Sequence, residues 1–516
     1  MICLIGFMGA GKSTALRSLE RSGLRTVDRD QLLEERQGAS IPHLYSDLGV
    51  QGFREAEAAL ALEVLSDPEV DALALGGGTV LSSEVRQALS GPDRTVVWLK
   101  QDVEEAWSRV EGGNRPLARE RDQFIELYEE REPLYRELAD AVVVGPQPDA
   151  VEAALPALRA FDTAIPDGAR LIWLDLGSSS HPVVVGPELD LGGLLAPGGP
   201  FAPGAGRSLL VWDSNVSGAV GERFGETLGP VEVPAGESSK SLSVAEEVLR
   251  GMALLGASRT DRVLAVGGGV TGDLAGFCAA TYQRGIDLVH VPTTLVAQVD
   301  SAYGGKTGVD LPEGKNYVGA FHQPVSVLTD TGLLESLPEE ELAAGMAEVV
   351  KTGLLAGGTL WETVKGLQPG EIRSRPDVIF ECALHKCEVV ADDEKDRGAR
   401  ATLNLGHTVG HAIETATGYD RYRHGEAVSL GLLAALELSE ADGLRTEVEE
   451  VVERHGLPVA LDPAVDTEDV LTAVGFDKKR TDEGVAFILL EEPGSPQTGA
   501  VLPDDQVRAA IEALSR

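Results

Sequence analysis

The sequence predicts an α/β protein with two parallel-sheet regions followed by a mostly helical region. Short apolar runs such as ICLIGF, residues 2–7, alternate with helical stretches through the first 145 residues. A second alternating series, with the runs SLLVWD, RVLAVGGG and DLVHVPTT, starts near residue 170. After about residue 337 the hydrophobic spacing is almost wholly helical.

Length and loop composition divide the chain. At 516 residues it exceeds a single core and suggests about three domains. Residues 146–169 contain several prolines and no motif, so we expect a linker there. The expected domains are an N-terminal unit over 1–145, an α/β domain over 170–335 and a helical domain over 336–516.

Composition excludes some classes of function. The net charge of −39 argues against a nucleic-acid-binding surface, which requires clustered Lys and Arg. No apolar run approaches 18 residues and the start does not fit a signal peptide, so we expect no membrane segment and a cytoplasmic enzyme. The cysteines, which form no C-x-x-C pair, are expected to be reduced and packed; they are Cys3, Cys278, Cys382 and Cys387.

Lysine is rare in this chain. Only eleven of the 44 basic residues are lysines, so arginine is the default surface cation. A lysine kept against that bias is expected to be needed as a compact charge whose pKa can shift. Six of the eleven fall inside the motifs described below, and two more, Lys478 and Lys479, stand together in FDKKR, residues 476–480.

The first motif is a phosphate-binding loop. GFMGAGKST, residues 6–14, satisfies G-x-x-x-x-G-K-[ST] directly after an apolar strand and before a helix. Backbone N–H groups of such a loop surround phosphates, the lysine reaches the β and γ oxygens, and the following hydroxyl ligates Mg²⁺. A fortuitous glycine turn is the alternative. The residues expected at ATP are Gly9, Gly11, Lys12, Ser13 and Thr14.

Five short motifs follow this loop in order. They are VDRD (27–30), GFREAE (52–57), GGGTV (76–80), RPLA (115–118) and REPLY (131–135). Their order and spacing resemble those of shikimate kinase over residues 1–144. The resemblance implies ATP, Mg²⁺ and shikimate as ligands. A kinase for another small hydroxy compound, such as gluconate, is the alternative.

The resemblance assigns roles that suit the chemistry of these side chains. Arg54 and Arg131 would clamp the shikimate carboxylate, because guanidinium groups donate forked hydrogen bonds. Asp30 would orient the acceptor hydroxyl or take its proton. The other expected contacts are Asp28 with Ser13 at magnesium, Gly76, Gly77 and Gly78 at the ring, and Arg115, which closes on the transferring phosphoryl group.

Two histidines stand four residues apart in LNLGHTVGHAIE, residues 403–414. Residues at i and i+4 share one face of a helix, so His407 and His411 can approach one metal ion. The metalloprotease pattern H-E-x-x-H requires a glutamate after the first histidine. Thr408 occupies that position, so a protease would lack its general base.

The surrounding motifs are long. AVGGGVTGDLAGF (265–277) is a glycine turn that differs from G-x-G-x-x-G, and the segment 291–321 carries clustered lysines that suggest an anionic substrate. Further motifs are WDSN (212–215), PAGESSK (234–240), GMAEVVKTG (345–353), HKCEVV (385–390) and RHGEAV (423–428). From about residue 170 to the C-terminus, the set closely resembles 3-dehydroquinate synthase.

This second resemblance implies a metal site, an NAD site and a homodimer formed through the synthase unit. The implied ligands of zinc or cobalt are Glu348, His407 and His424, with His411 as a catalytic proton relay instead of a ligand. The pair His407 and His411 ranks second. The implied NAD contacts are Asp213, Glu237, Lys240, Gly268, Gly269, Val270, Asp273, Thr293, Thr294 and Lys315.

The implied substrate is 3-deoxy-D-arabino-heptulosonate 7-phosphate, which the family converts to 3-dehydroquinate and phosphate while NAD⁺ is reduced and regenerated. The implied substrate contacts are Asp300, Lys306, Asn316, Lys386, Arg400, Asn404, Lys478 and Lys479, and Lys306, Lys351 and Arg400 are also expected to be catalytic. Two residues depart from the family pattern: Tyr303 replaces a small aliphatic residue and Asp396 replaces a glutamate.

Together the motifs predict a bifunctional shikimate-pathway enzyme, with shikimate kinase fused to 3-dehydroquinate synthase. Three alternatives stay open. The C-terminal part could be another sugar-phosphate cyclase, or a metal-dependent alcohol dehydrogenase that releases NADH. Its many lysines argue against an uncharged alcohol. A catalytically inactive nucleotide-binding scaffold is the third alternative, and complete motifs in both halves argue against it.

Overall fold

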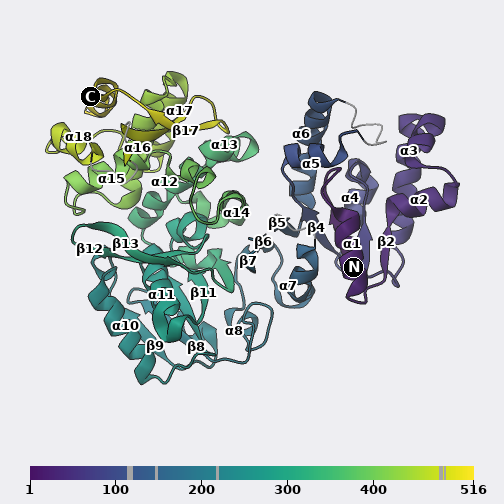
Figure 1. Cartoon of the computed structure of the whole chain (residues 1–516), viewed down its shortest axis with the longest axis horizontal. Helices are drawn as coiled ribbons and strands as arrows, with labels where there is room; N and C mark the ends of the chain where they lie inside the picture. The colour runs from purple at the N-terminus through teal and green to yellow at the C-terminus, as the bar shows by residue number, and fades with distance from the viewer. Residues whose placement is uncertain (113–119, 146–148, 217–219, 476–479, 482–483, 516) are drawn as a thin grey trace. The chain divides into compact units, whose positions relative to one another are not determined.

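The chain folds into two compact units. The computed structural model describes residues 1–112, 120–145, 149–216, 220–475, 480–481 and 484–515. The N-terminal unit comprises Met1–Val184 and Leu189–Pro203, and the C-terminal unit comprises Val185–Glu188 and Gly204–Arg516. Figure 1 shows their elements, coloured from purple at the N-terminus to yellow at the C-terminus. Every described helix falls short of the length and apolarity needed to span a bilayer.

The N-terminal unit alternates strands and helices, as predicted. Its strands are β1 (Ile2–Ile5), β2 (Thr26–Asp28), β3 (Ala72–Ala74), β4 (Thr95–Leu99), β5 (Ala141–Val144), β6 (Arg170–Asp175) and the first part of β7 (Ser180–Gly186). Its helices are α1 (Lys12–Arg21), α2 (Arg29–Gln37), α3 (Ile41–Leu65), α4 (Ser83–Leu89), α5 (Val103–Val110), α6 (Arg121–Leu138), α7 (Ala150–Ala164) and α8 (Leu191–Leu194).

The sheet of this unit is parallel over its first six strands, in the order β2-β3-β1-β4-β5-β6. Ile2 pairs with Ala72 on one side and with Thr95 on the other, so the apolar run of β1 is buried at the centre. Because the strands are parallel, the loops after β1, β2 and β3 leave the sheet at one edge. Those loops carry three of the predicted kinase motifs.

The predicted linker at 146–169 differs from the structure. Its described part contains α7, whose apolar residues at helical spacing include Val151, Leu155 and Leu158, all buried. Ser22, which follows α1, donates a hydrogen bond to Glu152 of this helix at 2.8 Å. Strand β6 then pairs with β5 in the same sheet. The prolines of this segment do not prevent a helix, and its apolar face packs it into the N-terminal unit.

The C-terminal unit begins with an α/β region. Its strands are β8 (Ser208–Asp213), β9 (Pro230–Val233), β10 (Arg262–Gly267), β11 (Asp287–Pro292), β12 (Lys306–Leu311), β13 (Gly314–Phe321) and β14 (Ser326–Asp330), and its helices are α10 (Leu242–Leu254) and α11 (Gly269–Thr281). Five strands form parallel pairs in the order β14-β11-β10-β8-β9, while β12 and β13 form an antiparallel hairpin. Apolar side chains of these strands and of α10 and α11 share one buried core, which includes Val211, Val248, Val263, Leu274 and Leu288.

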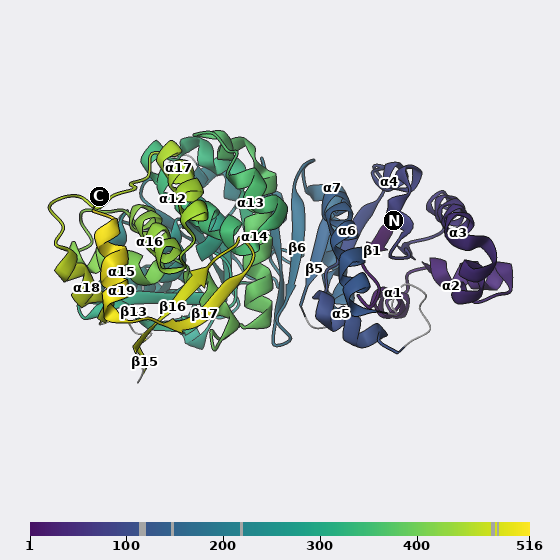
Figure 2. The same ribbon diagram turned by 90° about the horizontal axis from the view of Figure 1, so that it is seen from above.

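The rest of the chain is mostly helical, as expected. Its helices are α12 (Glu339–Ala356), α13 (Gly358–Val364), α14 (Pro376–Asp392), α15 (His407–Ala416), α16 (His424–Leu438), α17 (Asp442–Arg454), α18 (Thr467–Gly475) and α19 (Asp504–Ala513). A small antiparallel sheet of β15 (Arg480–Thr481), β16 (Gly484–Leu490) and β17 (Pro496–Val501) is an addition that the sequence analysis did not predict. Figure 2 shows β16 and β17 beside α16, which β16 contacts.

Helices α15 and α16 approach each other unusually closely. A Cβ added to Gly431 of α16 would lie 2.0 Å from the carbonyl oxygen of Gly406, the residue that precedes α15. A Cβ added to Gly410 would lie 3.1 Å from the carbonyl oxygen of Ala427. Helix α16 also contacts α12. Because the glycines at this crossing have no side chains, α15 and α16 pack closely, and their first residues lie near α12.

This crossing gives a first prediction. Gly431→Ala should lower the free energy of unfolding by about 1–3 kcal/mol, because the added methyl group overlaps backbone that cannot rotate away. The matched control is Gly443→Ala, since Gly443 lies in α17 with no atom within 4 Å of an added Cβ. Urea unfolding followed by circular dichroism measures both variants. Equal stability of the two would contradict the close packing.

Candidate active sites

The phosphate-binding loop connects β1 to α1. Gly9 has φ of 86°, and a Cβ there would lie 2.6 Å from the carbonyl oxygen of Ala106, so only glycine fits. The Lys12 ammonium donates hydrogen bonds to the carbonyl oxygens of Gly6 at 2.7 Å and Phe7 at 2.8 Å. Lys12 is thereby held over the loop where a phosphate would bind.

The end of β2 faces this loop. The Ser13 hydroxyl donates a hydrogen bond to Asp28 at 2.6 Å, so the two expected magnesium ligands are adjacent. Asp28 also caps α2, because its other oxygen accepts from the N–H of Asp30 at 3.0 Å. A cavity of about 540 Å³ is lined by residues 9–14, Asp28 and Asp30. It also contains Arg109 in its wall, which the sequence analysis did not select.

A second cavity of about 390 Å³ adjoins the first, since Ser13, Asp28, Asp30 and Gly77 line both. Its wall includes the expected shikimate contacts Asp30, Arg54, Gly76, Gly77, Gly78 and Arg131. Arg131 donates a hydrogen bond to the carbonyl oxygen of Gly77 at 3.4 Å. A Cβ on Gly78 would lie 1.9 Å from the guanidinium of Arg54, so glycine leaves space for that side chain.

Two buried charges in this wall were missed by the sequence analysis. Arg29 is 1% exposed and forms ion pairs with Asp30, at 2.6 Å, and with Glu57. Glu57 is also buried and pairs with Arg54. An ionic chain therefore joins Asp30 to Arg54 through Arg29 and Glu57. Both residues lie inside the motifs VDRD and GFREAE, but their burial could not be seen in the sequence.

The expected NAD segments of the C-terminal unit lie at the carboxyl ends of parallel strands. Asp213 ends β8, the segment 234–240 follows β9, Gly268 and Gly269 follow β10, and Thr293 and Thr294 follow β11. Ligands of open α/β sheets bind outside this edge. Val270, next to Gly269, lies in the first turn of α11.

Polar groups at this edge suit a dinucleotide. Lys240 donates a hydrogen bond to Asp273 at 2.5 Å. The hydroxyl of Thr293 is buried and has no hydrogen-bond partner. A buried polar atom without a partner is unusual, and a bound ligand can supply that partner.

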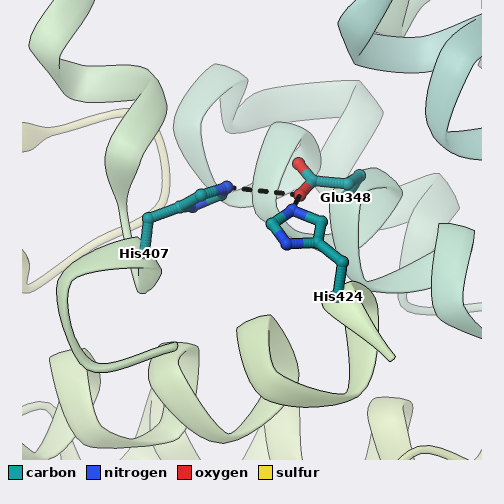
Figure 3. A group of neighbouring side chains, drawn as sticks. All are labelled: Glu348, His407 and His424. Atoms are coloured by element: carbon teal, nitrogen blue, oxygen red, sulfur yellow. Dashed lines mark ion pairs between the residues drawn. The ribbon is translucent and has the colours of Figure 1, made fainter. Parts of the chain in front are cut away.

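The three expected metal ligands converge from three helices, as Figure 3 shows. Glu348 comes from α12, and His407 and His424 begin α15 and α16. The Nε2 atoms of His407 and His424 lie 3.4 and 3.3 Å from Oε1 of Glu348. One ligand atom from each residue fits within 4.8 Å of the others.

The electrostatics of this group fit a divalent cation. Burial would raise the pKa of Glu348, but the charges of Lys351 and His407 outweigh it and hold that pKa well below its usual range. Burial would lower the pKa of His424, but Glu348 and Glu414 raise it to about 10. Glu348 is fully buried, and its Oε1 faces both histidines while its Oε2 faces the ammonium of Lys351. The carboxylates thus attract positive charge, and two imidazoles and one carboxylate are zinc or cobalt ligands.

His411 lies beside this group. Its ring centroid is 5.2 Å from that of His407 and 6.0 Å from that of His424. A second set of possible ligand atoms contains His411, Glu414 and His424. The i, i+4 spacing therefore places His411 near the site, while the more buried group around Glu348 does not include it.

A cluster of cations surrounds Asp300 next to Glu348. Lys351 lies 2.5 Å from Glu348 and 3.8 Å from Asp300, and Lys386 donates a hydrogen bond to Asp300 at 2.5 Å. Burial would raise the pKa of Asp300, but the two ammonium groups lower it to about 2. Burial lowers the pKa of Lys386, with Asp300 opposing the shift. Lysines are thus concentrated where the sequence analysis expected an anionic substrate.

The other expected substrate residues lie around this cluster. Arg400 donates hydrogen bonds to the carbonyl oxygens of Gly304 and Glu394, both at 3.1 Å, and Asn404 follows in the same 3₁₀ turn. Lys306 donates to Asp396 at 2.5 Å, so the unusual aspartate still reaches that lysine. Tyr303 is buried and donates to the carbonyl oxygen of Gln298 at 2.6 Å.

Lys315 connects an NAD segment to the helices, and its neighbour Asn316 does not. Lys315 lies 3.2 Å from Glu237 and 3.4 Å from Glu414, and Asn316 is exposed on β13 with φ of 57°. Three further expected residues, Arg115, Lys478 and Lys479, lie outside the described residues. Glu414 was not selected from the sequence, although it ends the motif GHAIE.

Family models match most of the chain. The shikimate kinase model matches residues 8–158. Models of the N-terminal and C-terminal parts of 3-dehydroquinate synthase match residues 230–344 and 345–480.

Related proteins agree with these matches. A 3-dehydroquinate synthase of Symbiobacterium thermophilum is 43% identical over 364 residues, which is 66% of this chain and 100% of the relative. A 2-deoxy-scyllo-inosose synthase structure with carbaglucose-6-phosphate, NAD⁺ and Co²⁺ is 25% identical, with a TM-score of 0.59 over 66% of this chain and 99% of its own. A 2-epi-5-epi-valiolone synthase from Streptomyces hygroscopicus, with NAD⁺ and Zn²⁺ bound, is 26% identical, with a TM-score of 0.57 over 65% of this chain and 97% of its own. The chain therefore belongs to the 3-dehydroquinate synthase family and carries a shikimate kinase domain ahead of its synthase part, so that one polypeptide combines two shikimate-pathway enzymes.

Proposed function

We propose that the N-terminal site phosphorylates shikimate with ATP and Mg²⁺, and that the C-terminal site converts 3-deoxy-D-arabino-heptulosonate 7-phosphate to 3-dehydroquinate and phosphate with NAD⁺ and zinc or cobalt. The observation that carries the second assignment is the position of Glu348, His407 and His424 beside a cluster of lysines. A dianionic phosphate and a carboxylate need several cations, and this site has them.

In the kinase site, the residues act by positioning and by charge. Arg54 and Arg131 would hold the shikimate carboxylate in the smaller cavity, while Asp30 accepts the proton of the hydroxyl that is phosphorylated. Lys12 would stabilise the charge on the transferring group from the adjoining cavity, and Arg115 is proposed to close over it. Ser13 and Asp28 would hold the magnesium ion.

In the synthase site, Glu348, His407 and His424 would hold a metal ion that would supply a Lewis acid for the reacting hydroxyl oxygen. The segments that follow β8 to β11 would hold NAD⁺, which would supply a hydride acceptor and donor. Lys351 and Lys386 now contact Asp300 and would contact substrate oxygens when the substrate binds. The further proposed substrate contacts are Lys306, Arg400, Asn316, Asn404, Lys478 and Lys479. His411 would relay protons to substrate oxygens, because an imidazole titrates near neutral pH. A dehydrogenase for an uncharged alcohol would not need this cluster of ammonium groups.

The family resemblance also supports three broader proposals. The enzyme works in the cytoplasm and forms a homodimer through its synthase part. The kinase domain extends past the expected boundary at 145 to include α7, and the helical synthase domain is proposed over 336–516, close to residue 345, where the C-terminal family match begins. Sedimentation of the purified protein tests the dimer.

The two activities should be separable. Lys12→Met removes the charge that faces the phosphates and should lower ATP-dependent shikimate phosphorylation at least about a hundredfold. The synthase rate should stay unchanged, because Lys12 and the metal-binding group lie in different units. Coupled assays of ADP and phosphate release measure both rates. The control is Lys365→Met, a surface lysine paired with Glu362 and Glu447. Equal loss of both activities in Lys12→Met would exclude two independent sites.

The redox balance of the synthase is a second test. NAD⁺ at one tenth of the substrate concentration should support full conversion, because the hydride is returned within each turnover. Absorbance at the NADH wavelength should not rise in proportion to product. Accumulation of one NADH for each product molecule would instead favour a dehydrogenase.

The two histidines of the GHTVGH segment should respond differently to substitution. His407→Ala, like Glu348→Ala and His424→Ala, removes a ligand and should reduce the bound metal well below one per chain. His411→Ala should keep its metal but lose activity, and added zinc should not restore it. Metal analysis of the purified variants, together with their rates, measures the difference. Equal metal loss in His411→Ala and His407→Ala would instead support the i, i+4 ligand pair.

A further inference from the structure

Glu414 is a buried carboxylate that the proposed reaction does not use. It lies in the last turn of α15 and is 3% exposed. Its Oε1 lies 3.4 Å from Nδ1 of His424 and 3.4 Å from the ammonium of Lys315, and its Oε2 has no hydrogen-bond partner. Burying a carboxylate costs several kcal/mol unless cations and donors compensate it. Such a group therefore needs a structural or functional reason.

The His424 imidazole stands between two carboxylates. Its Nε2 faces Glu348 at 3.3 Å and its Nδ1 faces Glu414 at 3.4 Å. A neutral imidazole can ligate a metal through Nε2 only when its proton is on Nδ1. Glu414 is placed to accept that proton, and carboxylates in this position are known to orient metal-binding histidines.

We propose that Glu414 is a positioning residue that accepts the Nδ1–H of His424 and so presents its Nε2 lone pair to the metal. This inference rests on the proposed ligand set of Glu348, His407 and His424. In this assignment Glu414 influences the metal only by orienting His424. Glu414 touches neither the metal nor the substrate in this assignment.

Lys315 explains how Glu414 keeps its charge in this place. The Lys315 ammonium lies between Glu414, at 3.4 Å, and Glu237, at 3.2 Å, and packs over the Tyr419 ring at 4.5 Å from its centroid. An ionic chain therefore runs from His424 through Glu414 and Lys315 to the turn after β9, which is one of the expected NAD segments. The metal ligand and the nucleotide-binding edge of the sheet share this chain.

A second metal ion held by His411, Glu414 and His424 is the competing explanation, since their ligand atoms also lie close together. The position of Lys315 argues against it. Lys315 and Nδ1 of His424 both face Oε1 of Glu414, so that oxygen is already shared by two cationic partners. At Glu348, by contrast, the ammonium of Lys351 lies at Oε2 and leaves Oε1 to the two histidines. We therefore assign one metal ion to each chain.

The test measures Co²⁺ binding to the metal-free full-length protein, without substrate. Glu414→Gln keeps the shape of the side chain and removes its charge, whereas Glu414→Asp keeps the charge and shortens the side chain. For Glu414→Gln we expect a Co²⁺ dissociation constant about 10- to 100-fold higher than in the parent, with an altered visible spectrum. Glu414→Asp should bind Co²⁺ more tightly than Glu414→Gln does.

A role in packing alone predicts the reverse order, because glutamine fills the space of glutamate and aspartate does not. That order, or parental affinity in both variants, would overturn the proposal. Binding of two Co²⁺ ions per parent chain, with one lost in Glu414→Gln, would establish the second metal site instead. The matched control is Glu453→Gln, an exposed glutamate of α17 that should change nothing.

His424→Ala separates this inference from the ligand assignment. If His424→Ala binds Co²⁺ as tightly as the parent, the proposed ligand set itself is wrong. If His424→Ala loses Co²⁺ while Glu414→Gln keeps parental affinity, only the role of Glu414 is wrong. Thermal unfolding of every variant, followed by circular dichroism, identifies any that fail to fold, and the comparison of glutamine with aspartate then uses the folded pair.

Discussion

A buried carboxylate can keep its charge only when cations surround it, and this requirement organises the synthase site. Glu348 has no exposed surface and contacts Lys351, His407 and His424. The same charge balance extends outward, because Lys351 also faces Asp300 and Asp300 also faces Lys386. Anions and cations therefore alternate through the interior. In such a site a phosphate can take the place of a carboxylate beside the ammonium groups, and a metal ion can take the place of a cation beside Glu348. In either case no buried charge is left unpaired.

Close packing of helices makes this charge balance possible. The three ligands lie on three helices, and the glycines at the crossing of α15 and α16 let two of those helices begin near the third. The parallel strands bring together the residues of the two proposed nucleotide sites. In each unit the loops that follow neighbouring strands leave at one edge, so residues far apart in sequence line a common site.

The kinase site uses the same principle of paired buried charges. Arg29 and Glu57 connect Asp30, proposed to act on the acceptor hydroxyl, to Arg54, proposed to bind the carboxylate. The two ends of the substrate would thus be recognised by groups that hold each other in place. A guanidinium can serve several carboxylates at once because its donors point in fixed directions.

The sequence by itself determined the features that depend on neighbouring residues. The phosphate loop needs one strand, a few glycines and one helix, so residues 2–21 suffice to predict it. Strand alternation likewise predicted both sheets, and motif order identified both families. Spacing alone, however, favoured His407 with His411, because positions four apart share a helical face whatever surrounds them. Tertiary structure decided that Glu348 and His424 lie close to His407, that Arg29, Glu57 and Glu414 are buried, and that α7 joins the first sheet. Those facts depend on packing between segments distant in sequence, which local pattern does not contain.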